Sequence, residues 1–230
     1  MSFTLRSALL GAALLSTQAA ATEFSFLTGN PAPEAFGNSY SQTLDGVTAT
    51  ATAWSTTGRG GRYETAELEI YSSYGMGVCN RSEGINCSNS GNMHALDNSN
   101  GAVDLILFRF SSSVQLTKLT LLQFGNDSDL SLWAGTGNLN LAGLKPSNLG
   151  FETLALNTSQ VNDVKTVNLS NFYATYDWLA VSARLSQTND FAKLRTLYAQ
   201  AATSPVPEAD SSAMLLAGLG MVGFAVRRRA

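Results

Sequence analysis

Short segments with a two-residue repeat constrain the fold of this chain more than any other feature. In residues 47–54, threonine and tryptophan at the even positions alternate with valine and alanine at the odd positions. Residues 103–110 carry apolar side chains at both odd and even positions. Alternation with period two indicates a half-buried β-strand, and a strand that is apolar on both faces is buried on both. These two segments predict a sheet with covered faces.

Further strands are predicted along the middle of the chain. In residues 114–122 the first two apolar side chains lie at even positions and the next two at odd positions, and a β-bulge near Thr117–Lys118 would explain the slip. Residues 191–202 fit a last strand or a short helix. The other predicted strands are 130–133, 164–169 and 178–185. Strands at this spacing predict a single all-β domain, of the β-sandwich or jelly-roll type, over residues 22–203.

Charged residues are scarce, and this narrows the class of protein. Only 13% of the 230 residues are charged, whereas about 25% is typical of a soluble domain. No apolar run reaches the roughly 18–20 residues of a secure transmembrane helix, and 11 Phe, 7 Tyr and 3 Trp are enough to build a core. The scarcity of charge therefore indicates a secreted polar domain.

The net charge of the middle region excludes a class of partner. The two apolar ends hold four basic and two acidic residues, which leaves 10 basic against 15 acidic residues and a net charge of −5. This region has no basic patch of the kind that binds the phosphate backbone. We expect no nucleic-acid partner.

Residues 1–21 have the three parts of a secretory signal peptide. Arg6 supplies the positive charge, Ala8–Leu15 the short apolar stretch, and Ala19–Ala21 the small residues of a cleavage site. The alternative is a buried N-terminal helix, which does not require these parts in this order. We expect export, with the mature chain beginning near Thr22.

Residues 204–230 are the other atypical end. The apolar run Ala213–Val226 is followed at once by Arg227, Arg228 and Arg229. Its 14 residues rise about 21 Å as a helix, less than the roughly 30 Å of hydrocarbon in a bilayer. Arginines stay on the cytoplasmic side, so the segment fits a weak membrane stop. A permanent tail anchor and a helix of a soluble domain are the alternatives.

This end resembles the PEP-CTERM sorting signal of bacterial surface proteins, in which Val-Pro-Glu-Pro precedes a glycine-rich apolar helix and an arginine cluster. Val206, Pro207 and Glu208 match that pattern, and Ala209 replaces its last proline. The resemblance implies an exosortase as a transient partner, which would cut near Pro207 and Glu208. It also implies a pause at the inner membrane, delivery to the cell surface or extracellular matrix, and a Gram-negative host that often produces exopolysaccharide.

The middle region also resembles a family, the exosortase-dependent surface proteins. The similar segments are 75–79, 94–98, 126–129, 176–183 and 190–194. The biochemical role of that family is poorly defined, so the resemblance implies a cellular location and carries over no catalytic residue. We expect a non-catalytic surface protein with a structural, adhesive or exopolysaccharide-binding role.

Two cysteines, Cys79 and Cys87, are the whole cysteine content. An even number in an exported chain predicts a disulfide. The loop that it closes is short, so the entropic stabilisation is at most roughly 2.5 kcal/mol. Metal binding is the competing interpretation, but two cysteines make a poor zinc site and only His94 could assist them.

Catalytic motifs are absent from the sequence. His94 is the single histidine, and the chain has no Gly-x-Ser-x-Gly elbow, Walker loop, dinucleotide-binding glycine pattern or His-Glu-x-x-His. A glycosidase needs only two carboxylates. The alternative function is therefore a secreted carbohydrate-active enzyme, with Asp97, Asp104, Asp127 and Asp129 as its candidate carboxylates.

Clustered oxygen-bearing side chains offer a second candidate site. Asp97, Asn98, Asn100 and Asp104 have a spacing that calcium can use, although Phe108 stands where an EF-hand has its closing glutamate. Such clusters before strands are also common as hairpin turns, for local hydrogen-bonding reasons. A similar cluster, with the same alternative, is formed by Asp127 and Asp129.

Six aromatic residues fit either a sugar-stacking platform or ordinary packing. They are Tyr71, Tyr74, Trp133, Tyr173, Tyr176 and Trp178. The sequence leaves both alternatives open.

Overall fold

The structure is a computed structural model of the whole chain. It describes residues 21–28, 35–83, 94–123, 125, 127–156, 163–202, 218, 219, 224 and 227. Residues 1–20, which hold most of the predicted signal peptide, and Val206, Pro207, Glu208, Arg228 and Arg229 of the sorting signal lie outside these residues.

Thirteen strands make up the sheet in the described part of the chain. They are β1 (Thr22–Ser25), β2 (Ser39–Leu44), β3 (Val47–Gly58), β4 (Arg62–Thr65), β5 (Glu67–Tyr71), β6 (Gly75–Cys79), β7 (Leu96–Asp97), β8 (Asp104–Gln123), β9 (Leu130–Gly135), β10 (Thr153–Ala155), β11 (Val164–Asn168), β12 (Thr175–Ala183) and β13 (Phe191–Ala201). Two short 3-10 turns are η1 (Ser99–Gly101) and η2 (Pro146–Asn148). The predicted all-β fold is confirmed.

Strand β8 joins the two halves of the sheet. Its first part pairs with β3 on one side and β12 on the other, and its second part pairs with β13 and β11. On one side of β8, β13 replaces β3 as the partner between Phe110 and Val114, whereas β12 stays paired as far as Gln115. A strand that passes from one layer to the other forms a corner of a sandwich. The two predicted strands 103–110 and 114–122 are therefore one continuous strand.

The predicted β-bulge lies in the second part of β8. Lys118 faces Tyr198 and Leu116 faces Ala199, so Thr117 is the extra residue on β8. Because of this extra residue, Leu116 before it and Leu119 after it both point into the main core. Without the bulge, one of the two would face solvent, since side chains alternate along a strand. Residues 191–202, for which a strand and a helix were both open, form β13.

The core has two compartments on the two faces of β8. Ile106 and Phe108 point into the main core between the layers, where the Phe108 ring stacks on Phe26 at 5.4 Å. Leu105 and Leu107 point the other way, into a smaller core with Trp54, Tyr63, Trp133, Leu141 and Ala180. The predicted burial of this segment on both faces is confirmed, since all four side chains are at most 1% exposed.

The loop between β9 and β10 covers the smaller core. Leu141 is wholly buried beneath it, and the backbones of Tyr63 and residues 143–144 exchange hydrogen bonds of 2.8 and 2.9 Å. The loop thus acts as a lid over the outer face of β3, β8, β12 and β9.

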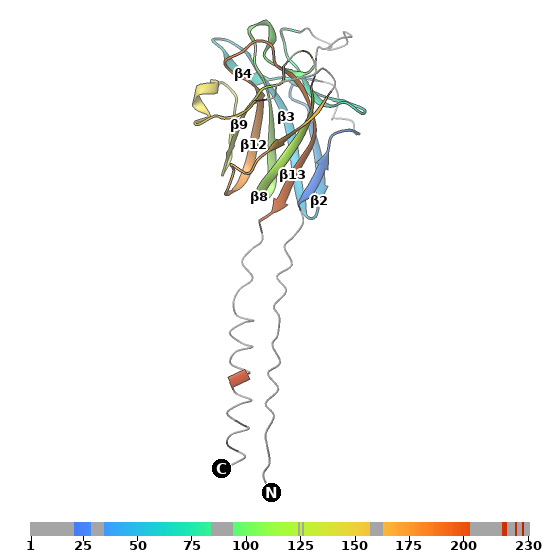
Figure 1. Cartoon of the computed structure of the whole chain (residues 1–230). Helices are drawn as coiled ribbons and strands as arrows, with labels where there is room; N and C mark the ends of the chain where they lie inside the picture. The colour runs from blue at the N-terminus through green and yellow to red at the C-terminus, as the bar shows by residue number, and fades with distance from the viewer. Residues whose placement is uncertain are drawn as a thin grey trace.

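The first and last strands of the domain lie side by side. β1 pairs antiparallel with β13, so that Thr22 faces Ala199. The Thr22 hydroxyl also donates a hydrogen bond to Asp45 in the β2–β3 turn. We call this end of the domain, marked by Thr22, Asp45 and Ala201, the tail pole. The β3–β4 turn lies at the opposite end (Figure 1).

Candidate functional site

Three aspartates from separate segments form the carboxylate cluster. Asp127 and Asp190 form an isolated parallel bridge, and Asp129 lies just before β9. One oxygen of each carboxylate lies within 4.8 Å of the others. Sequence reasoning proposed Asp127 and Asp129 and missed Asp190, which lies 61 residues from Asp129 and directly before β13. The only signal for it was another Asn-Asp pair preceding a predicted strand.

Hydrogen bonds inside the protein occupy the carboxylate cluster. The Asn98 amide donates to Asp190 Oδ2 at 2.5 Å, and the Asp190 backbone N–H donates back to Asn98 Oδ1 at 2.9 Å. Arg184 donates to Asp129 Oδ2 at 2.8 Å. Burial raises the pKa of Asp190 to about 6, the hydrogen bonds from Asn98 and Asp129 oppose this shift, and the charges of Asp127 and Asp129 add to it. Arg184 therefore already supplies positive charge to the cluster.

A second set, which we call the buried acids, contains the buried Asp97 and Asp104 and the half-buried Glu83. Asp104 is 0% exposed, and its Oδ1 accepts a hydrogen bond of 2.9 Å from the Asn80 amide. Burial, followed by the negative charges of Asp97 and Glu83, raises the pKa of Asp104 well above its ordinary value. Burial also raises the pKa values of Glu83 and Asp97.

The predicted calcium loop therefore divides between two networks. Asp97 Oδ1 accepts hydrogen bonds from the backbone and hydroxyl of Ser99 at 2.8 and 2.7 Å, which is the local turn chemistry of an Asx residue. Asn98 turns to the carboxylate cluster and Asp104 to Asn80. The side chain of Asn100 lies outside the described residues. Calcium binding stays a prediction.

Cys79, Glu83 and His94 are the other described group with closely spaced metal-ligand atoms. The described part of the chain has no free cysteine. The predicted disulfide of Cys79 would leave no thiolate for such a site. Cys87 lies outside the described residues, so the Cys79–Cys87 disulfide stays a prediction.

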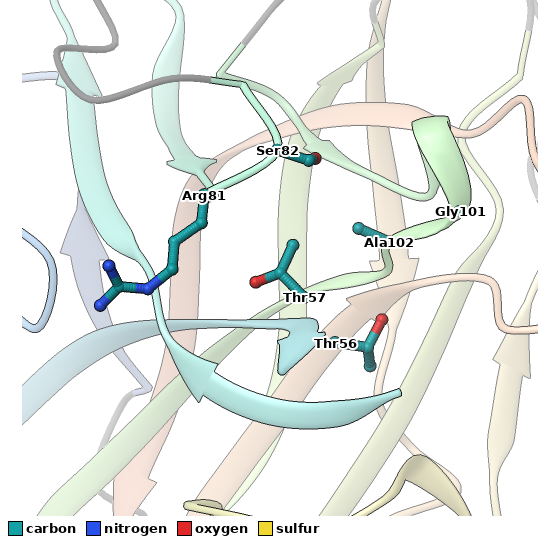
Figure 2. Close-up of a pocket in the computed structure, with 6 residues that line it drawn as sticks. All are labelled: Thr56, Thr57, Arg81, Ser82, Gly101 and Ala102. Carbon is teal, nitrogen blue, oxygen red and sulfur yellow. The ribbon is translucent and has the colours of Figure 1, made fainter. Parts of the chain in front are cut away.

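A hollow of about 380 Å³ lies near the buried acids. Its wall is made by Thr56, Thr57, Arg81, Ser82, Gly101 and Ala102. Figure 2 shows the small side chains facing one another while Arg81 extends away from them. The Arg81 guanidinium lies 4.3 Å from the centre of the Phe36 ring and 3.5 Å from Glu64. The lining residues offer hydroxyl groups but no general acid or base.

Two further hollows lie along strand β11. One of about 290 Å³ is lined by Gln115, Leu116, Thr117, Asn168, Ser170, Phe172, Tyr173 and Gln200. The other, of about 200 Å³, is lined by Leu132, Thr153, Leu154, Ala155, Leu156, Thr166, Val167, Asn168 and Asn171. Asn168 lines both, so we treat them as one feature, the β11 groove. None of these lining residues is charged.

The structure separates the six candidate aromatics. Trp133 is 2% exposed and belongs to the smaller core. Trp178 packs against that same core, and Tyr176 against the main one. Tyr71 lies beneath the ammonium group of Lys193, which is 3.3 Å from the ring centre. Tyr173 is 83% exposed in the β11 groove, and Tyr74 is 50% exposed elsewhere.

Four residues of the predicted sorting segment are described. Gly218, Leu219, Phe224 and Arg227 are helical, and the side chains of the last three are exposed. Among the described residues, no helix has both the length and the apolar character needed to cross a bilayer.

Comparison with known proteins identifies the sorting segment. The PEP-CTERM protein-sorting motif matches residues 205–229, which include the predicted Val206, Pro207 and Glu208 and the three arginines. No curated protein matches the chain. The chain carries a PEP-CTERM sorting motif and is an exported protein that an exosortase sorts at the membrane toward the cell surface.

Proposed function

We propose that the β-sandwich is a non-catalytic module of the cell surface that binds extracellular polysaccharide. The sorting motif supports the location. The observation that carries the non-catalytic part is the position of the candidate carboxylates. All four accept hydrogen bonds within the protein; Asp97, Asp104 and Asp129 are buried, and Asp127 is half-buried.

A glycosidase needs two carboxyl groups on opposite sides of an accessible sugar-binding cleft. Asp97, Asp104 and Asp129 are at most 5% exposed, and each accepts a hydrogen bond from a protein group. Asp127, the fourth candidate, accepts one from the Ser128 backbone at 2.9 Å. None of the four lines the β11 groove or the hollow of Figure 2. This arrangement favours structural roles for these residues.

The exposed surface of the domain favours a polar, neutral ligand. Threonine and serine side chains cover the outside of β2 and β3, where Ser41 and Thr50 share a hydrogen bond of 2.9 Å, as do Thr43 and Thr48 at 2.8 Å. Hydroxyl and amide groups both donate and accept, which suits a ligand rich in hydroxyls.

The test measures binding and turnover together. The full chain, held in a detergent without a sugar head group, is titrated with dextran, hydroxyethyl cellulose and alginate, and each mixture is then assayed for new reducing ends. We expect saturable binding of at least one polysaccharide and no new reducing ends. Reducing ends that form with the wild type and disappear in Asp127→Asn would replace the binding module with a carbohydrate-active enzyme. An absence of binding to all three would reject the proposal.

A further inference from the structure

The β11 groove has a built platform at one end. Phe172 is buried and its ring packs edge-on against Tyr176, with ring centres 5.7 Å apart. Its backbone N–H donates to Leu169 at 2.9 Å, and the N–H of Ser170 donates to Asn168 Oδ1 at 2.8 Å. This anchored turn holds the backbone of the neighbouring Tyr173 and leaves its ring exposed. Backbone that is ordered before binding loses little conformational entropy when a ligand covers the side chain.

The other lining groups surround this ring with hydrogen-bonding capacity. Gln115 and Thr117 are exposed on β8, and Gln200 reaches the groove from β13. Amides and hydroxyls supply both donors and acceptors, and the aromatic face supplies an apolar surface with a polar edge. A sugar ring has apolar C–H faces and a rim of hydroxyls. The groove offers an aromatic surface for the first and hydrogen-bonding side chains for the second.

We infer that the β11 groove binds an uncharged glycan chain, with Tyr173 stacking on one sugar ring and the surrounding amides bonding its hydroxyls. This inference rests on the proposed function and names its site and ligand class. The absence of charge from the lining argues against an acidic glycan, because a carboxylated sugar would lose water without gaining a cationic partner there. The two hollows share Asn168 in their walls, so a chain that continues beyond one sugar would reach the second, which the exposed Leu154 and Leu156 line.

The experiment is affinity electrophoresis of the full chain through native gels that contain dextran, hydroxyethyl cellulose or alginate. Neutral polysaccharide slows the wild type. The Tyr173→Ala chain binds at least about fivefold more weakly, since aromatic contacts contribute about 1 kcal/mol beyond the area they bury. Gln115→Ala weakens binding by about the same factor, as expected for one hydrogen bond. Tyr74→Ala, which removes an exposed tyrosine outside the groove, leaves binding unchanged.

The outcomes separate the groove from the broader function. If the wild type binds a neutral glucan and the Tyr173→Ala and Gln115→Ala chains bind it equally well, the groove is not the site, although the binding role stands. Retardation by alginate alone overturns the ligand class. No retardation in any gel overturns both the groove and the proposed function. Because Tyr173 is exposed, circular dichroism of Tyr173→Ala is expected to match the wild type, and this separates lost binding from lost folding.

Discussion

Buried carboxylates make the stability of this domain depend on pH in a predictable direction. The pKa values of Asp97, Asp104 and Glu83 are raised in the folded chain, and that of Asp190 is raised from 3.8 to about 6. At a pH between the ordinary pKa of these acids in the unfolded chain and their raised pKa in the folded chain, the folded chain holds more protons. The free energy of unfolding therefore falls as pH rises. At about 1.4 kcal/mol per pKa unit, ionisation of Asp190 alone lowers the free energy of unfolding by up to about 3 kcal/mol. We expect the midpoint temperature of thermal unfolding to fall as the pH rises from 4.5 to 7.

Asp163, Asp177 and Lys193, whose pKa shifts have the opposite effect, titrate outside this pH range. Hydrogen bonds lower the pKa values of Asp163 and Asp177, so these residues change the free energy of unfolding only below about pH 4. Burial lowers the pKa of Lys193 to about 8, which places its effect above pH 7.5. An Asp190→Asn chain is expected to show a weaker fall in thermal midpoint over the same range. A midpoint that rises from pH 4.5 to pH 7 would contradict the burial of these acids.

At the residue scale, the sequence showed which side chains matter but not which of them meet. Asp127 and Asp129 are local neighbours and were found together, whereas Asp190 joins them across 61 residues by accepting a hydrogen bond of 2.9 Å from the Asp129 backbone N–H. Asp97 and Asp104 were predicted as one loop, yet Asp104 bonds to Asn80, which precedes it by 24 residues. Local spacing cannot predict such partners, because they are set by which strands pair.

At the element scale, the bulge at Thr117 sets the register of the second half of β8. Deleting Thr117 moves either Leu116 or Leu119 out of the main core, together with the apolar residues on its side, because alternation in a strand has period two. We expect the deletion to abolish cooperative unfolding, as measured by near-ultraviolet circular dichroism during heating. Thr117→Ala keeps the extra residue and removes only an exposed side chain, so its midpoint is expected to stay within about 2 °C of the wild type. A deletion chain that melts like the wild type would refute this role of the bulge.

Strand length decided much of what could be predicted. β3 and β8 span 12 and 20 residues, long enough for alternation or a parity change to appear, whereas the pattern over β13 left a strand and a helix both open. β4, β7 and β10 have 4, 2 and 3 residues, too few for any period. The continuity of β8 was also missed, because three serines at its corner resemble a loop in the sequence.

At the scale of the whole molecule, we expect the tail pole to face the membrane while the sorting segment is attached, because the last strand of the domain ends at this pole. The β2–β3 turn is at this pole, and the β3–β4 turn lies at the other end of the 12-residue strand β3, about 35–40 Å away at 3.3 Å per residue. We expect a dye on Thr43→Cys to be quenched by spin-labelled lipid far more than a dye on Arg59→Cys. The measurement is fluorescence of the full chain in vesicles.

A chain without residues 205–229 is the control for this orientation. Both dyes are then expected to be quenched equally and weakly, because the segment that holds the chain at the bilayer has been removed. Stronger quenching at position 59 than at position 43 in the full chain would mean that the domain faces the membrane with its other end.

The pairing of β1 with β13 also sets an order of events during export. Thr22 begins the first strand, and its partner Ala199 lies six residues before the sorting motif starts at residue 205. A chain that crosses the membrane from its N-terminus cannot close this sandwich until β13 has emerged, because the contacts made by β13 are among the most distant in the sequence. By then the sorting motif is entering the membrane. We therefore expect completion of folding and recognition by the exosortase to fall close together in time, with the newly closed domain next to the segment that is to be cut.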